Sequence, residues 1–186
     1  MSRMVVTDTP IAGVKRVHRQ PLADERGFLT RLFCAQELAL AGWDKPLAQV
    51  NHASTQRRGT VRGLHYQLAP HAEMKLVSCL RGEVWDVAVD LRFGSPTFLH
   101  WHAQLLSAAN HCALLIPEGC AHGFQSMSDD AELLYCHSEP YEAQADKGLH
   151  PLDRRLGIPW PLPVTLLSDR DAQHPASDAE FVGVQL

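Results

Sequence analysis

Apolar and polar residues alternate along much of this chain, which is the pattern of half-buried β-strands. The clearest case runs from Glu83 to Leu91, where Trp85, Val87 and Val89 recur at every second position. Seven further segments show the features of strands: Leu47–Ala53, Thr60–Tyr66, Lys75–Leu80, Phe98–Ser107, His111–Ile116, His122–Met127 and Glu132–Ser138. Many short strands at this spacing predict an all-β antiparallel sandwich or barrel.

Two short helices are predicted at the edges of this barrel. One covers Ala35–Ala41 and ends at Gly42, and the other begins at Ser168, whose hydroxyl can cap it. From Tyr141 onward the chain is rich in proline and polar residues. We expect a single domain over residues 1–186, in which the segment 141–186 wraps a core of about residues 21–140.

Composition narrows the class of protein. The net charge of -4 does not suggest a nucleic-acid partner, and no apolar stretch approaches the ~20 residues of a membrane span. Five cysteines are scattered without a C-x-x-C pair, so neither a zinc ribbon nor a disulfide framework is indicated. A reducing, cytoplasmic setting is the simplest interpretation.

One stretch has the outline of a cupin metal site with the wrong ligands. The first cupin motif has a glycine, then His-x-His, a glutamate and a second glycine. Here Gly59 and His65 fit, but Gln67 takes the place of the second histidine and Lys75 that of the glutamate, with Gly82 following. Because a cation repels a divalent metal, the sequence predicts no metal and points to organic acid–base chemistry in a jelly-roll barrel.

The histidines of this site each have a structural alternative. His122 fits the second cupin motif, Pro-x-Gly-x-x-His, but it is equally compatible with a core histidine after a tight turn. His65 lies in a strand, and the polar residues near it favour catalysis because such residues in a core strand need a ligand or a partner. Arg62 cannot be assumed to share the face of His65, since a bulge at Gly63 would alter the register.

The other candidates are weaker when they are considered alone. Lys75 is either a solvated strand start or an inward-pointing cation that stabilises an enolate oxygen. Tyr135 has the features of a core aromatic residue, and Asp169 and Asp171 those of a solvated turn.

Taken together, these motifs resemble the dTDP-4-dehydrorhamnose 3,5-epimerases, cupins of the rhamnose pathway, from about Pro21 to about Pro175. The matching segments include Asp24–Phe28, Gln49–Asn51, Arg62–Gln67, Lys75–Val77, Arg81–Arg92, Gly94–Thr97, Ile116–Gly119, Ala121–Phe124, Gly157–Pro161 and Ser168–Asp171. The resemblance implies a homodimer that acts on a nucleotide-diphosphate sugar. It also implies that no redox or metal cofactor is needed.

The family's roles carry over by position. The resemblance makes His65 the base, Asp171 the carboxylate that orients it, Lys75 the enolate cation and Tyr135 the acid. It implies substrate-binding roles for the following residues: Arg26, Gln49, Asn51, Arg62, His122 and Tyr141.

The chain also departs from the family. Arg31 replaces an acidic residue expected near the nucleotide, Leu29 replaces an aromatic residue, Cys120 replaces a larger apolar residue, and Glu139–Tyr141 and Pro151–Asp153 differ from the usual residues. This pattern suits another nucleotide sugar or inversion of one carbon only. A 3-epimerase, a 3,4-ketoisomerase and a non-enzymatic nucleotide-sugar binder remain open, and a metal-dependent dioxygenase is the least favoured alternative.

Overall fold

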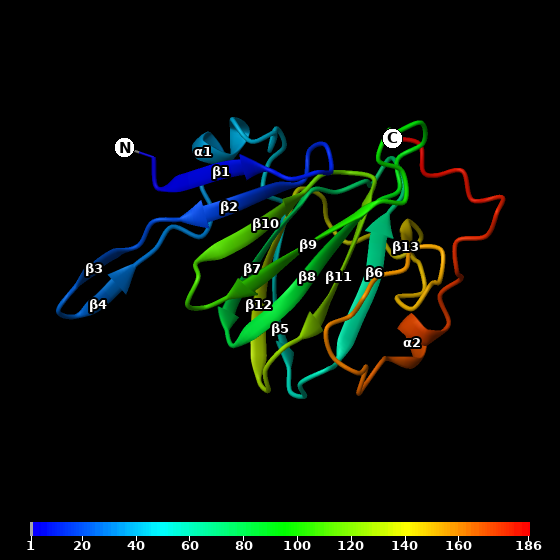
Figure 1. The fold of residues 1–186 in the computed structure, drawn as a ribbon. Coiled ribbons are helices and arrows are strands. Elements are labelled where there is room, and N and C mark those ends of the chain that lie inside the picture. The colour runs from blue at the N-terminus through cyan, green and yellow to red at the C-terminus, as the bar shows by residue number, and fades with distance from the viewer. Residues whose placement is uncertain (1) are drawn as a thin grey trace.

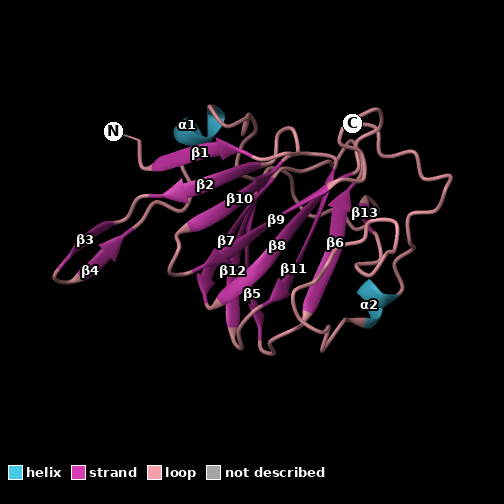
Figure 2. Ribbon diagram, in the orientation of Figure 1, coloured by secondary structure: helices cyan, strands magenta, loops and turns pink. Residues whose placement is uncertain are grey.

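The computed structural model describes residues 2–186, and nearly every element in it is a strand (Figure 2). The strands are β1 (Met4–Asp8), β2 (Lys15–Arg19), β3 (Leu22–Asp24), β4 (Gly27–Leu29), β5 (Gln49–Thr55), β6 (Val61–Gln67), β7 (Lys75–Arg81), β8 (Glu83–Asp90), β9 (Trp101–Ser107), β10 (Cys112–Ile116), β11 (Cys120–Ser126), β12 (Ala131–His137) and β13 (Asp146–Gly148). The helices are α1 (Ala35–Ala39) and α2 (Asp169–Ala172).

Two antiparallel sheets form the body of the molecule (Figure 1). The first has the strand order β1-β2-β10-β7-β12-β5, and the second has the order β13-β6-β11-β8-β9. Consecutive strands pass from one sheet to the other, as in β6 to β7 and β10 to β11, which is the connectivity of a jelly roll. The all-β jelly-roll prediction is confirmed.

Strand alternation produces three apolar layers. Between the sheets, Val77 and Leu133 of the first sheet pack against Val84 and Phe124 of the second. The outer face of the first sheet packs against α1 and the chain after it, including Trp43. The outer face of the second sheet is covered by the C-terminal segment, whose buried apolar residues are Leu149, Leu156, Ile158 and Val184.

The predicted core strands are confirmed, with boundaries that shift by up to three residues. The segment predicted from Phe98 enters its strand only at Trp101, because a turn containing Leu99 at φ 61° intervenes. Both helices are confirmed, and the Ser168 hydroxyl accepts the hydrogen bond of the Asp171 backbone N–H as a helix cap. The short strands β1–β4 and β13 were not predicted.

A hairpin of β3 and β4 projects away from both sheets (Figure 1). Its apolar residues Leu22, Phe28 and Leu29 are 49%, 62% and 72% exposed. This hairpin is therefore an apolar arm that the body of the same chain does not cover. Among the described residues, no helix has the length and apolarity needed to cross a membrane.

Candidate active site

A cavity of about 510 Å³ is lined by strands of both sheets. Seven of the ten residues predicted for the site line it: Asn51, Arg62, His65, Lys75, His122, Tyr135 and Tyr141. Asp171 and Gln49 contact members of this set directly, and Arg26 lies elsewhere. Segments far apart in the sequence thus meet at one site.

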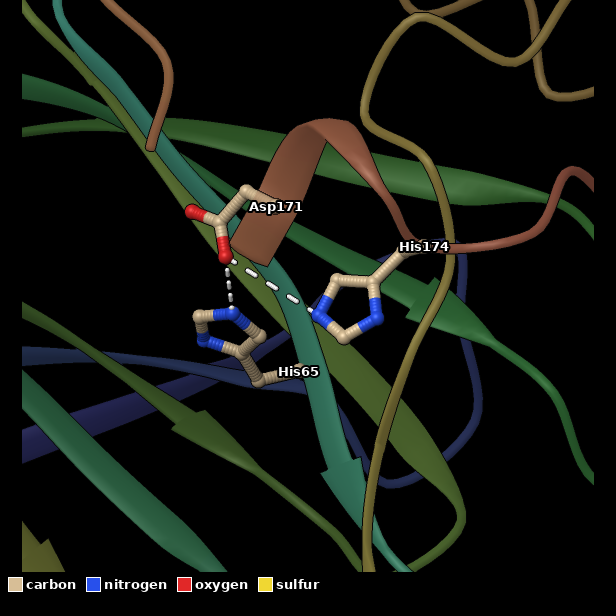
Figure 3. A group of neighbouring side chains, drawn as sticks. All are labelled: His65, Asp171 and His174. Atoms are coloured by element: carbon tan, nitrogen blue, oxygen red, sulfur yellow. Dashed lines mark hydrogen bonds and ion pairs between the residues drawn. The ribbon is translucent and has the colours of Figure 1, made fainter. Parts of the chain in front are cut away.

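His65 and Asp171 form a hydrogen-bonded pair (Figure 3). His65 Nε2 lies 2.7 Å from Asp171 Oδ1, and because a carboxylate only accepts, Nε2 carries the hydrogen and Nδ1 keeps its lone pair. The second oxygen of Asp171 accepts the backbone N–H of Gly63 at 3.1 Å. Burial opposes ionisation of Asp171, but the hydrogen bonds from His65 and Gly63 hold its pKa below the usual value.

A β-bulge brings Arg62 and His65 to the same face of β6. His65 is opposite His122 and Arg62 is opposite Phe124, so two residues of β6 face the single Gly123 of β11. A bulge is present at Gly63, the feature that left the face of Arg62 open in the sequence. Gly63 has φ 120°, and a Cβ there would lie 2.5 Å from Gly123 Cα, so only glycine fits.

Lys75 is an inward-pointing cation and not a solvated strand start. It is 6% exposed, and its ammonium donates to the His65 carbonyl at 3.2 Å. Glu73 Oε1 lies 3.1 Å from the same ammonium, and His137 Nδ1 donates to Glu73 Oε2 at 2.6 Å. Burial opposes the charge on Glu73, but Lys75 and His137 lower its pKa overall. Both Glu73 and His137 line the cavity, and sequence analysis missed them.

Tyr135 lies on the inner face of β12 between two imidazole rings. It meets His122 edge to face, with ring centroids 5.7 Å apart, and stacks on His137 at 5.9 Å. Burial, reinforced by the nearby Asp86, raises the pKa of the Tyr135 hydroxyl above its usual value. The hydroxyl therefore stays protonated and can donate a proton into the cavity.

A second imidazole–carboxylate pair begins at His122, which lines the cavity. His122 Nε2 is 2.7 Å from Asp86 Oδ1, and both side chains are buried. Asp86 Oδ2 has no hydrogen-bond partner among the described residues. Burial raises the pKa of Asp86, although His122 opposes this. This pair supports the edge of Tyr135 from within the barrel.

Amide side chains organise the rim of the cavity. Gln49 donates to Asn51 Oδ1 at 3.0 Å and accepts the backbone N–H of Tyr141 at 3.0 Å. Gln67 donates to the carbonyl of Pro140 and accepts the backbone N–H of Glu142. Gln67, at the lost ligand position, thus anchors the segment that carries Tyr141.

Two residues differ from the expected set. Arg26 lies at the turn of the projecting hairpin, where its side chain is 85% exposed and pairs with Asp24. His174 was not predicted, but its Nε2 lies 3.9 Å from Asp171 Oδ1 and its ring lies edge to face with His65. The only signal in the sequence is its spacing, three residues after Asp171, or about one helical turn.

The arrangement suits proton transfer next to a carbonyl group. One cavity contains an imidazole with a free lone pair, a buried ammonium and a protonated phenol, contributed by β6, β7 and β12. Such a set can remove a proton, stabilise the resulting oxyanion and return a proton from another direction.

Comparison with known proteins gives one consistent family. Residues 8–178 match the family model described as dTDP-4-dehydrorhamnose 3,5-epimerase. The dTDP-4-dehydrorhamnose 3,5-epimerase of Shigella flexneri is 44% identical over 169 residues, covering 90% of this chain and 93% of its own. A dTDP-4-dehydrorhamnose 3-epimerase of Streptomyces niveus is 41% identical over 162 residues, which cover 87% of this chain and 78% of the relative.

Solved structures agree with this result. The dTDP-6-deoxy-D-glucose-3,5-epimerase of Legionella pneumophila, crystallised in complex with dTDP-4-keto-L-rhamnose, superposes with a TM-score of 0.90 at 39% sequence identity. The superposition covers 97% of this chain and 98% of that one.

Proposed function

Because the chain belongs to the dTDP-4-dehydrorhamnose 3,5-epimerase family and is a carbohydrate epimerase, we propose that it inverts C3, C5 or both carbons of a nucleotide-diphospho-4-keto-6-deoxyhexose. The ketone at C4 makes the hydrogens at C3 and C5 acidic, since the electron pair left by either proton spreads onto the ketone oxygen. The enzyme then has to remove a proton from one face and return one to the other.

His65 is the base in this mechanism. Its Nδ1 takes the proton from carbon, and the imidazolium that forms is stabilised by the Asp171 carboxylate 2.7 Å from Nε2. Lys75 stabilises the enolate oxygen, because its ammonium is buried at the cavity and held by the His65 carbonyl and Glu73. The electron pair of the broken C–H bond moves onto the ketone oxygen during this step.

Tyr135 is the acid that completes inversion. As the enolate collapses, its hydroxyl delivers a proton to carbon from the face opposite His65, and the phenolate recovers a proton from solvent. Raising the pKa of this hydroxyl keeps it protonated before the transfer. The observation that carries the proposal is the convergence of His65, Lys75 and Tyr135 on one cavity, with Asp171 orienting the base.

Substrate binding is proposed for the polar residues of the rim. Arg62, Asn51 and His122 line the cavity, Gln49 fixes Asn51, and Tyr141 lies at the exposed edge. Arg31 stands at the position where the family has an acidic residue. Its guanidinium pairs with Glu37 and is not available to the nucleobase of the substrate. The nucleotide is therefore a variable to be tested.

We further propose a homodimer in which each β3–β4 hairpin reaches the cavity of the other copy. A two-stranded hairpin with exposed Leu22, Phe28 and Leu29 is marginally stable alone and needs an apolar partner surface. Such an arm brings Arg26 to the diphosphate of the partner's substrate. Light scattering tests the dimer, and Arg26→Ala is expected to raise KM more than it lowers kcat.

We also propose a cytoplasmic location. All five cysteines are free thiols, and four of them are buried in the barrel or its flanks. Free thiols in this number are typical of a reducing compartment. Fractionation of the native host tests this location.

Proton NMR in heavy water tests the function. The protein is incubated with 4-keto-6-deoxyhexoses linked to different nucleoside diphosphates, and the recovered sugar is examined at C3 and C5. Exchange with inversion at both carbons identifies a 3,5-epimerase, and inversion at C3 alone identifies a 3-epimerase, the activity of the relative from Streptomyces niveus. Migration of the ketone indicates a ketoisomerase, and binding without exchange at either carbon would contradict an epimerase.

A further inference from the structure

His174 adds a third ligand-type atom beside the His65–Asp171 pair (Figure 3). The three side chains offer one ring nitrogen each from His65 and His174 and one carboxylate oxygen from Asp171. These three atoms all lie within 4.8 Å of one another. The mechanism above uses two of these residues and gives His174 no task.

The ring of His174 is held in place, but its Nε2 is unused. Nε2 is buried and has no hydrogen-bond partner among the described residues. A Cβ at position 148 would lie 2.4 Å from two atoms of this ring, so Gly148 leaves the space that the imidazole fills. Because buried polar atoms almost always have a partner, this nitrogen beside a carboxylate is available to a metal ion.

Two distances between the ligand atoms lie on either side of the distance expected between neighbouring ligands of a tetrahedral metal ion. Bonds of ~2.0–2.1 Å from zinc to nitrogen and oxygen place neighbouring ligand atoms roughly 3.3 Å apart. His65 Nε2 lies 2.7 Å from Asp171 Oδ1, and His174 Nε2 lies 3.9 Å from the same oxygen. The first distance has to open and the second to close by about half an ångström. The two imidazole nitrogens, which lie within 4.8 Å of each other, are brought to the same spacing by rotation of the side chains.

The central ligand is well anchored for this purpose. Asp171 is capped by Ser168 at its backbone N–H, and its second oxygen accepts from Gly63. The neighbouring guanidinium of Arg170 is paired with Asp146. Asp171 Oδ1 is thus presented to the two imidazoles from a fixed backbone position.

We propose that His65, Asp171 and His174 form a binding site for Zn²⁺ or a similar borderline divalent metal, and that the bound metal inhibits the enzyme. Two imidazoles and one carboxylate suit zinc, whereas Mg²⁺ and Ca²⁺ prefer oxygen ligands. Water or a substrate oxygen completes the coordination from the cavity.

The metal takes the place of the hydrogen shared by His65 and Asp171. The ring hydrogen moves from Nε2 to Nδ1, so the neutral imidazole offers its Nε2 lone pair to zinc while Oδ1 of the carboxylate binds the same ion. With Nε2 on the metal and Nδ1 carrying the hydrogen, His65 has no lone pair left to accept a proton from carbon. The binding step depends on the ligand geometry alone, whereas the inhibition rests on the proposed function, in which His65 is the base.

Calorimetry measures the binding step without reference to activity. Zinc titrated into the full-length protein above the usual pKa of imidazole, in two buffers of different ionisation enthalpy, is expected to bind one ion per chain with the same heat in both buffers, because neutral imidazoles and a carboxylate lose no proton on binding. His174→Gln is expected to weaken this binding by at least the ~10-fold that even an outer-shell change costs. His100→Gln, which alters an exposed histidine away from the cavity, is the matched control and is expected to retain it.

Deuterium exchange then measures inhibition. Zinc is expected to stop exchange at C3 and C5 in the wild type, a chelator to restore it, and His174→Gln to retain activity at zinc concentrations that inhibit the wild type. Equal zinc affinity in the wild type and His174→Gln would overturn the site. Zinc bound at this site with full exchange would overturn the inhibition, and undiminished exchange in metal-free His65→Asn would instead overturn the base assignment.

Discussion

The two imidazole–carboxylate pairs in this protein have the same separation and different surroundings. In both, a histidine Nε2 lies 2.7 Å from an aspartate oxygen. The side chain of His65 is 31% exposed and faces the cavity, whereas that of His122 is 6% exposed. The pKa of Asp171 is lowered and that of Asp86 is raised.

Burial is the main cause of the raised pKa of Asp86, and the second oxygen of each carboxylate adds to the difference. Asp171 Oδ2 accepts a backbone hydrogen bond from Gly63, while Asp86 Oδ2 has no partner among residues 2–186. A carboxylate with both oxygens engaged is stabilised as an anion, and a half-engaged carboxylate in an apolar interior favours its protonated form. The first pair is therefore suited to moving protons, and the second to supporting Tyr135.

The largest expected effect comes from removing the exposed imidazole. His65→Asn is expected to reduce exchange at both carbons by at least ~10²-fold, because general-base catalysis is lost. The thermal unfolding midpoint should stay close to that of the wild type, since the ring is partly exposed. Near-normal exchange in this variant would show that another group is the base.

Removing the phenol that the buried pair supports separates exchange from inversion. Tyr135→Phe is expected to lower inversion by about 10²-fold while deuterium still enters the sugar, because His65 and Lys75 remain. NMR of the recovered sugar measures both quantities. Full inversion at the wild-type rate would assign the acid to water or another group.

A smaller and different effect is expected from the buried carboxylate. Asp86→Ala should lower the free energy of unfolding by about 2 kcal/mol, because it leaves the buried His122 nitrogen without its partner. Urea denaturation measures this, with Asp171→Ala as the comparison. The contrast between the two pairs fails if Asp86→Ala leaves stability unchanged.

The smallest expected effect is a pH dependence of the free energy of unfolding that Asp86 causes. Asp90, on the same strand β8, is the control. Burial opposes ionisation of Asp90, but Arg92, Ser95 and Thr97 lower its pKa from 3.8 to about 2. The stability that Asp90 contributes is therefore present above pH 3.8 and is lost as the pH falls through about 2.

The contribution of Asp86 to stability changes with pH in the opposite direction. Its raised pKa means that the folded protein keeps a proton that the unfolded chain loses above pH 3.8, so its contribution declines as the pH rises from there. Asp86→Asn, which keeps an oxygen facing His122, should remove this decline, and Asp90→Asn should flatten the loss in acid. Unfolding free energies measured between about pH 2 and about pH 7 test both expectations.

Much of the fold is predictable because strand alternation is a local signal. In core strands such as β8, apolar residues recur at every second position, so that at least one face of the strand is apolar. Turn residues mark the ends of these strands. β2 escapes prediction because only Val17 is apolar in Lys-Arg-Val-His-Arg, and β13 is too short to show any period. Arg19 in β2 is nevertheless buried, bonded to Ser78 and two carbonyls.

The site was predictable only where a motif covers it. Glu73 and His137 meet because β12 pairs with β7 in a register that sets His137 opposite Lys75. Alternation reveals neither the order of strands nor their register, so these contacts stay hidden in the sequence. Local pattern was also wrong for Asp171, which is buried by packing of α2 against β6, while Asp169 beside it is exposed.

The covering of the second sheet by the C-terminal segment has a consequence for the timing of activity. The proposed base and its orienting carboxylate are 106 residues apart, and all of the sheet strands precede Asp171 in the chain. Synthesis from the N-terminus therefore produces all of these strands before the carboxylate, and the pair is assembled only when the segment after β13 has docked. Partial unfolding that releases this segment separates His65 from Asp171, so the proposed activity is expected to report on the attachment of this segment.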